Sequence, residues 1–165
     1  MRRKILCIIV SATLCFCNAY AADTNGWDTI YLAPQSQETP NYNIYHNSRF
    51  GYSVAFPNYF SQSGEMPGNG DGISMAGDDA LLSISGMYNA LDETPEDQLK
   101  YAGSDLYAEE ITENSLSYYS DEGDRELFCF QWVEDIIISI YIEYPKEQHE
   151  KYIEIIDYMI ESMEI

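Results

Sequence analysis

Two short acidic stretches carry the oxygen ligands that a hard cation prefers. They are NGDG at residues 69–72 and GDD at residues 77–79, and calcium binds several carboxylate and carbonyl oxygens at once. The first stretch is not followed by the glutamate that closes an EF-hand loop. Both also have the composition of ordinary chain reversals. We therefore interpret them as turns and keep Asp71, Asp78 and Asp79 as weak calcium candidates.

Zinc and thiol chemistry would need partners that the sequence does not supply in the required order. His149 is followed by a glutamate, as in the zinc protease motif, but Ile153 stands where the second histidine ligand belongs. The one other histidine is His46. Cys129 could act as a nucleophile if His149 lay beside it. Cys129 falls instead in the alternating apolar pattern of residues 126–133, which is typical of a small buried side chain.

Motifs for nucleotide binding and acyl transfer are missing from the sequence. It contains no G-x-S-x-G, P-loop or G-x-G-x-x-G pattern. Pairs of acids carry no information here, because 28 Asp and Glu residues produce such pairs by chance. We predict no catalytic residue and no cofactor, and we interpret the protein as non-enzymatic. A hydrolase that uses acids or Cys129 is the less favoured alternative.

The charge balance restricts the partner. The chain has 28 acidic and 8 basic residues, which gives a net charge of −20. Removing residues 1–21 would take away three basic residues and no acid, leaving 28 against 5, or −23. Such a field repels phosphate backbones and anionic lipid head groups. We therefore expect a protein partner, for which a basic surface suits the charge best, and no nucleic acid.

Tyrosines accompany the acids in polar stretches, for example Tyr42, Tyr45, Tyr118 and Tyr119. Tyrosine beside acids suits a surface that recognises basic residues of another protein. The alternative is ordinary packing within strands and at sheet edges, which we favour because single exposed aromatic residues are common on protein surfaces.

The first 21 residues have the features of a secretory signal peptide. Residues 2–4 are basic, residues 5–17 are apolar, and Ala19-Tyr20-Ala21 is a small-x-small cleavage site. The apolar run is shorter than the ~20 residues that span a bilayer. We expect cleavage after Ala21, export to the periplasm or the medium, and no membrane insertion afterwards. Cys129 would then be the one remaining cysteine, which excludes an internal disulfide.

Strand patterns follow a polar lead segment. Residues 22–48 are rich in Pro, Asn, Gln and Ser, and we expect an irregular segment with at most one short strand at 27–32. The stretch RFGYSVAFP at 49–57 predicts one strand from Phe50 to Phe56, with the bulky side chains on one face and a stop at the proline.

Strand and helix signals alternate in the second half. The apolar runs 72–76 and 80–88 flank a Gly-Asp-Asp turn and predict a hairpin. Thr94, followed by proline and two acids, predicts a helix from 95 to about 110. Three strand patterns follow, at 116–120, 126–133 and 136–144. The last of them is apolar on both faces, so we expect it to be central in the sheet.

The strongest amphipathic signal lies after Pro145. Apolar residues recur there at helical spacing, at Tyr152, Ile155, Ile156, Met159, Ile160 and Met163. We expect this helix to lie across the sheet on the isoleucine face of strand 136–144. The order of the elements predicts an α+β fold, with a mainly antiparallel β-sheet flanked by helices.

Several of these stretches resemble the exported PsbP-like proteins, relatives of the extrinsic photosystem II subunit and of the Mog-type Ran-binding proteins. They are RFGYSVAFP at 49–57, NGDG at 69–72, GDDALLSI at 77–84 and IEYPKEQHEKYIEIIDYMIESM at 142–163. The resemblance runs from about Asn47 to the C-terminus. It implies an α/β/α sandwich, which we assign as a single PsbP-like domain at 49–165.

The resemblance also implies a mostly non-catalytic scaffold that binds other macromolecules. The photosynthetic role does not carry over, because no residue here matches a motif that would support it, and Ran binding is not supported in a protein that we expect to be exported. Our leading hypothesis is an exported domain that binds another envelope or secreted protein. The alternatives are an immunity or antagonist protein that masks a basic toxin, a hydrolase, and a calcium-dependent structural module.

Overall fold

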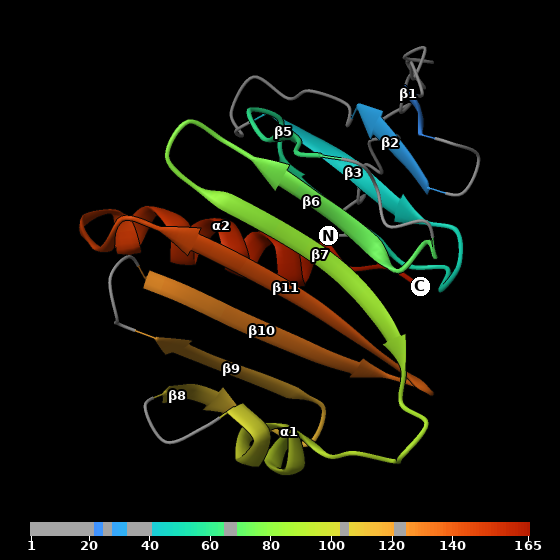
Figure 1. Ribbon diagram of the computed structural model, residues 1–165, viewed down its shortest axis with the longest axis vertical. Helices are drawn as coiled ribbons and strands as arrows, with labels where there is room; N and C mark the ends of the chain where they lie inside the picture. The colour runs from blue at the N-terminus through green and yellow to red at the C-terminus, as the bar shows by residue number, and fades with distance from the viewer. Residues whose placement is uncertain (1–21, 25–27, 33–40, 65–68, 103–105, 121–124) are drawn as a thin grey trace, which may run out of the picture.

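Two antiparallel sheets organise the computed structural model, which describes residues 22–24, 28–32, 41–64, 69–102, 106–120 and 125–165. The predicted signal peptide lies outside these residues. One sheet has four strands and the other has seven, and helices lie against the larger sheet (Figure 1). This confirms the predicted α+β class, a mainly antiparallel sheet flanked by helices.

The seven-stranded sheet combines strands from both halves of the chain. Its order is β5 (Ser61–Gln62), β6 (Gly72–Ala76), β7 (Leu81–Tyr88), β11 (Ile136–Tyr144), β10 (Arg125–Val133), β9 (Ser115–Ser120) and β8 (Tyr107–Ile111). The four-stranded sheet has the order β1 (Ala22–Thr24), β2 (Asp28–Leu32), β3 (Tyr42–Asn47) and β4 (Ser53–Pro57). The helices are α1 (Pro95–Ala102), the short 3-10 helix η1 (Lys146–Gln148) and α2 (His149–Glu161). No helix among the described residues is long and apolar enough to cross a membrane.

Strand β11 lies at the centre of the larger sheet, between β7 and β10, as its two apolar faces predicted. Its side chains alternate between two cores. Ile138 and Ile140 are buried in the major core, and Ile137 is buried in a second core on the other face. A central strand must bury both faces, which explains why nearly every residue of β11 is apolar or aromatic.

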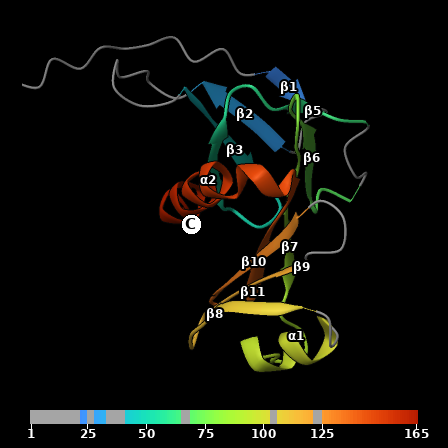
Figure 2. The same ribbon diagram turned by 90° about the vertical axis from the view of Figure 1, so that its left-hand side faces the viewer.

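Helix α2 covers one face of this sheet, together with the smaller sheet (Figure 2). Tyr152, Ile156 and Met159 are fully buried in the major core, where the isoleucine face of β11 also lies. The predicted position of the C-terminal helix is therefore confirmed. Burying large apolar side chains contributes about 1.5–3 kcal/mol each, so α2 is central to stability.

Helix α1 packs against the second core, which contains Leu116, Tyr118, Phe130 and Ile137. Its start matches the sequence prediction: the backbone N–H of Asp97 donates to the Thr94 hydroxyl at 3.3 Å. The predicted end at about residue 110 is wrong. The helix ends at Ala102, and β8 begins at Tyr107 because this segment pairs with β9.

The predicted strand from Phe50 to Phe56 is too long at its start. The side-chain carbonyl of Asn47 accepts hydrogen bonds from the backbone N–H groups of Arg49 and Phe50, at 3.1 and 2.9 Å. Gly51 then adopts a positive φ of 79°, which glycine accepts without a steric penalty. The chain therefore turns here, and β4 begins at Ser53.

In the segment 22–48, the one short strand expected at 27–32 is present as β2, but the expectation that the rest is irregular is wrong for the described residues. They form β1, β2 and β3, which pair in sequence and join β4. Tyr45 on β3 is fully buried in the major core. The backbone hydrogen bonds of these strands come from partner strands, so their polar composition did not reveal them.

Candidate functional site

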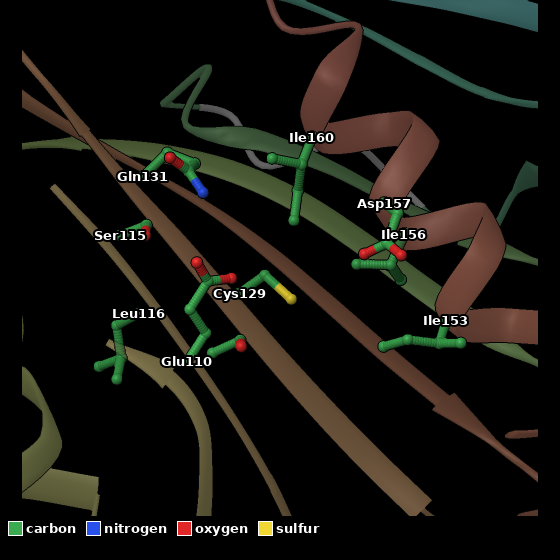
Figure 3. A pocket seen from close by; sticks show the side chains of 10 residues that line it. Glu110, Ser115, Leu116, Cys129, Gln131, Ile153, Ile156, Asp157 and Ile160 are labelled. Carbon is green, nitrogen blue, oxygen red and sulfur yellow. The ribbon is translucent and has the colours of Figure 1, made fainter. Parts of the chain in front are cut away.

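A groove of about 180 Å³ lies between α2 and the strands at the β8 end of the larger sheet. Helix α2 contributes Ile153, Ile156, Asp157 and Ile160, which share one side of the helix because they are three or four residues apart. Ile153, Ile156 and Ile160 of the helix, together with Cys129, give the groove an apolar floor (Figure 3).

The strands supply the polar side of the groove. Ser115 and Ser117 alternate with Leu116 on β9, and Gln131 follows Cys129 by two residues on β10, so these polar side chains lie on the α2 face of the sheet. Glu110 comes from β8, next to an irregularity in its pairing with β9. A bulge of this kind redirects the neighbouring side chains.

Glu110 and Asp157 approach the groove from opposite sides, one from β8 and one from α2 (Figure 3). Among the described residues, neither carboxylate makes a hydrogen bond or an ion pair, and no basic residue lines the groove. Two acids above an apolar floor can bind a cationic group that is carried on an aliphatic stem.

A second hollow, of about 430 Å³, lies on another side of α2 and is aromatic. Its walls include Tyr42 and Tyr158, whose ring centroids are 4.3 Å apart, and Tyr59. The Lys151 ammonium lies 5.7 Å from the centre of the Tyr59 ring. A cation of the protein itself therefore already lies against this aromatic wall.

Asp79, in the β6–β7 turn beside this hollow, connects the turn to α2 and to the preceding η1 through side-chain hydrogen bonds. Its carboxylate accepts hydrogen bonds from the Tyr152 hydroxyl and the Gln148 amide, and the Lys151 ammonium lies 3.5 Å away. The Tyr152 hydrogen bond, helped by Gln148 and Lys151, holds the pKa of Asp79 below its usual value. Burial, with the charge of Asp79 added, raises the pKa of Tyr59 to about 12. This cluster is a connected network within the fold.

The three calcium candidates do not come together. Asp71 precedes β6, whereas Asp78 and Asp79 follow it, and five strand residues separate the two ends by about 17 Å. Asp71 instead pairs with Arg49 and accepts a hydrogen bond from the Asn69 amide. Over the described part of the chain, no three His, Cys, Asp or Glu side chains are grouped so that they could hold a metal ion.

The structure also separates Cys129 from His149. The thiol is buried on β10 and lines the groove. The imidazole lies at the start of α2, where its Nδ1 is 2.9 Å from the Tyr144 hydroxyl. Tyr144 pairs with Arg125, four residues along β10 from the cysteine, so the two side chains cannot act as one nucleophilic pair.

Packing accounts for three of the four tyrosines singled out in the sequence. Tyr42, Tyr45 and Tyr118 are buried, as the favoured interpretation predicted, and Tyr119 is half-buried. Sequence reasoning missed the groove instead. Its acid Glu110 fell in a segment predicted to be helical, and Asp157 was one acid among several on the polar side of the C-terminal helix.

Comparison with known proteins identifies structures with a similar fold. No protein-family model matches the sequence, and no curated protein matches it. The solution structure of PsbP (CyanoP) from Synechocystis sp. PCC 6803 aligns with a TM-score of 0.52 at 13% identity, over 81% of this chain and 97% of that chain. The crystal structure of the Ran-binding protein Mog1p from Saccharomyces cerevisiae aligns with a TM-score of 0.54 at 10% identity, over 77% of this chain and 96% of that chain. The resemblance predicted from the sequence is thus confirmed as a PsbP/Mog-like fold.

Proposed function

We propose that the protein is an exported, non-catalytic domain that binds a basic segment of another envelope or secreted protein. The observation that carries this proposal is the groove beside α2, where Glu110 and Asp157 face an apolar floor with no described base to neutralise them. The predicted signal peptide at residues 1–21 supports export.

Two further observations support a binding role. The net charge of −20 attracts a basic partner from a distance and raises the rate of encounter. One protein with the same fold, Mog1p, is named as Ran-binding. This fold can therefore present a protein-binding surface.

The test is co-purification from the source cell. The full chain with a C-terminal tag is expressed with its own signal, captured at low and at high salt, and the retained proteins are identified by mass spectrometry. We expect a stoichiometric basic partner at low salt that is lost at high salt, because salt screens exposed charges. Recovery of the tagged protein without any partner at either salt would contradict the binding role.

The same sample tests export. The mass of the captured protein should correspond to a chain that begins at Ala22. A chain that retains residues 1–21, recovered from the cytoplasm, would refute the export part of the proposal. The identity of the partner would also separate an envelope protein from a toxin, for which the chain would act as the antagonist.

A further inference from the structure

We propose that the groove between α2 and strands β8–β10 is a socket for a single arginine side chain of the partner. This inference rests on the proposed binding function and names the chemical group that the groove recognises.

The floor of the groove suits the stem of such a side chain. Ile153, Ile156 and Cys129 provide apolar surface, and the volume of about 180 Å³ is on the scale of one side chain rather than of a folded segment. Long basic side chains lay their methylene groups along apolar surface while the charged end stays near polar groups.

The polar groups favour arginine over lysine. Glu110 and Asp157 supply carboxylate oxygens on two sides, and Gln131 with the two β9 serines adds further acceptors. A guanidinium group has five N–H donors in a fixed planar arrangement, whereas an ammonium group has three. Acceptors on several sides of a narrow groove can therefore satisfy a guanidinium more fully.

Other acids of the chain show what the groove lacks. Asp71 pairs with Arg49, Asp79 with Lys151, and Asp97 with Lys100. Glu110 and Asp157 are exposed and have no such partner among the described residues, which is also true of other exposed acids such as Glu150; they differ from these in lining one shared, partly apolar groove. The missing positive charge is the one that an incoming arginine would bring.

The first experiment titrates the purified protein with a short glycine-flanked arginine peptide, followed by NMR of the backbone amides. Identical peptides with lysine, or with citrulline as the neutral isostere of arginine, are the comparisons. We expect saturable shifts at Cys129, Gln131 and Ile156 with arginine, weaker shifts with lysine and none with citrulline. Equal binding of citrulline or of lysine, or shifts centred elsewhere, would overturn the socket.

Variants then test the two carboxylates. We expect Glu110→Gln and Asp157→Asn each to weaken binding of the arginine peptide by about threefold to fivefold, as for ion pairs between solvent-exposed side chains. The matched control is Glu150→Gln, an exposed residue in the first turn of α2 that does not line the groove. An equal loss in Glu150→Gln would show that only the overall charge matters and would overturn the socket.

Failure of the socket can be separated from failure of the binding function. If the double variant Glu110→Gln/Asp157→Asn retains the natural partner as well as the unchanged protein does, the socket is wrong and the binding function stands. If the unchanged protein retains no partner, the binding function itself is wrong. Loss of the partner in the double variant alone would support both proposals.

Discussion

Helix α2 has acidic groups near two of its sides, and they differ in their surroundings. On one side, Asp79 accepts hydrogen bonds from Tyr152 and Gln148 and lies near Lys151. On the other side, Asp157 and Glu110 both line the groove. Neither carboxylate has a hydrogen-bond or ion-pair partner among the described residues. The first carboxylate is bound within the fold, whereas the second pair is exposed and is the one that we propose as a binding site. Acidity alone therefore does not indicate function; the neighbouring donors decide it.

The largest expected effect comes from a substitution that disrupts the packing of α2, the helix beside which both sites lie. Ile156→Asp would place an unpaired carboxylate in the major core, at a cost of more than about 4 kcal/mol, so we expect no stable folding. Glu154→Asp, on an exposed position of the same helix, is the control. A soluble Ile156→Asp protein with a cooperative thermal transition would disprove the packing of α2.

The next largest effect is expected at Asp79, whose carboxylate is hydrogen-bonded to Tyr152 and Gln148. We expect Asp79→Ala to lower the free energy of unfolding by about 1–3 kcal/mol, because the hydroxyl of the buried Tyr152 loses its carboxylate acceptor. Asp78→Ala alters the neighbouring, exposed residue of the same turn and should change it by less than about 0.5 kcal/mol. Chemical denaturation measures both. Equal losses would mean that the turn, and not the network, determines the effect.

The stability difference between the unchanged protein and Asp79→Ala should also depend on pH. The pKa of Asp79 is lowered in the folded state, so the unfolded chain binds the proton more readily. The contribution of Asp79 is therefore fully present above the unfolded value of about 4 and is lost as the pH falls through the lower folded value. We expect the stability gap between unchanged protein and Asp79→Ala to narrow in acid. A gap that stays constant below pH ~4 would argue against an ionised Asp79 in the network.

The smallest effect on stability is expected at the groove. Asp157→Asn and Glu110→Gln should each change the free energy of unfolding by less than about 0.5 kcal/mol, because neither carboxylate has a described partner to lose. The two residues would then affect binding without affecting the fold. Destabilisation as large as that of Asp79→Ala would show that the two sides of α2 are alike after all.

Periodicity in the sequence was enough for the elements with a continuous apolar pattern. The alternation in 126–133 and 136–144 assigned each side chain to the correct face, and the stripe after Pro145 identified the buried side of α2. These patterns are reliable because a strand repeats every two residues and a helix every 3.6. A side chain on the wrong face would expose apolar surface along the whole element.

Local patterns failed where pairing with a distant strand decides the conformation. Residues 107–111 continue a helical signal, yet they form β8 because β9 supplies their hydrogen bonds. The strands β1 and β3 likewise were not expected from the sequence and pair with β2, the one short strand that was predicted in this segment. Glu110 was consequently placed on the wrong kind of element, and the groove could not be anticipated.

By itself the sequence determined that the chain is strongly acidic, which faces of its main strands and last helix are apolar, and that it resembles a PsbP-like fold. Only the tertiary structure decided which acids are neutralised. Asp79 and Tyr152 are 73 residues apart in the chain, and Asp71 and Arg49 are 22 apart. Charges interact over a few ångströms in space, and that separation is set by how the sheets and helices pack.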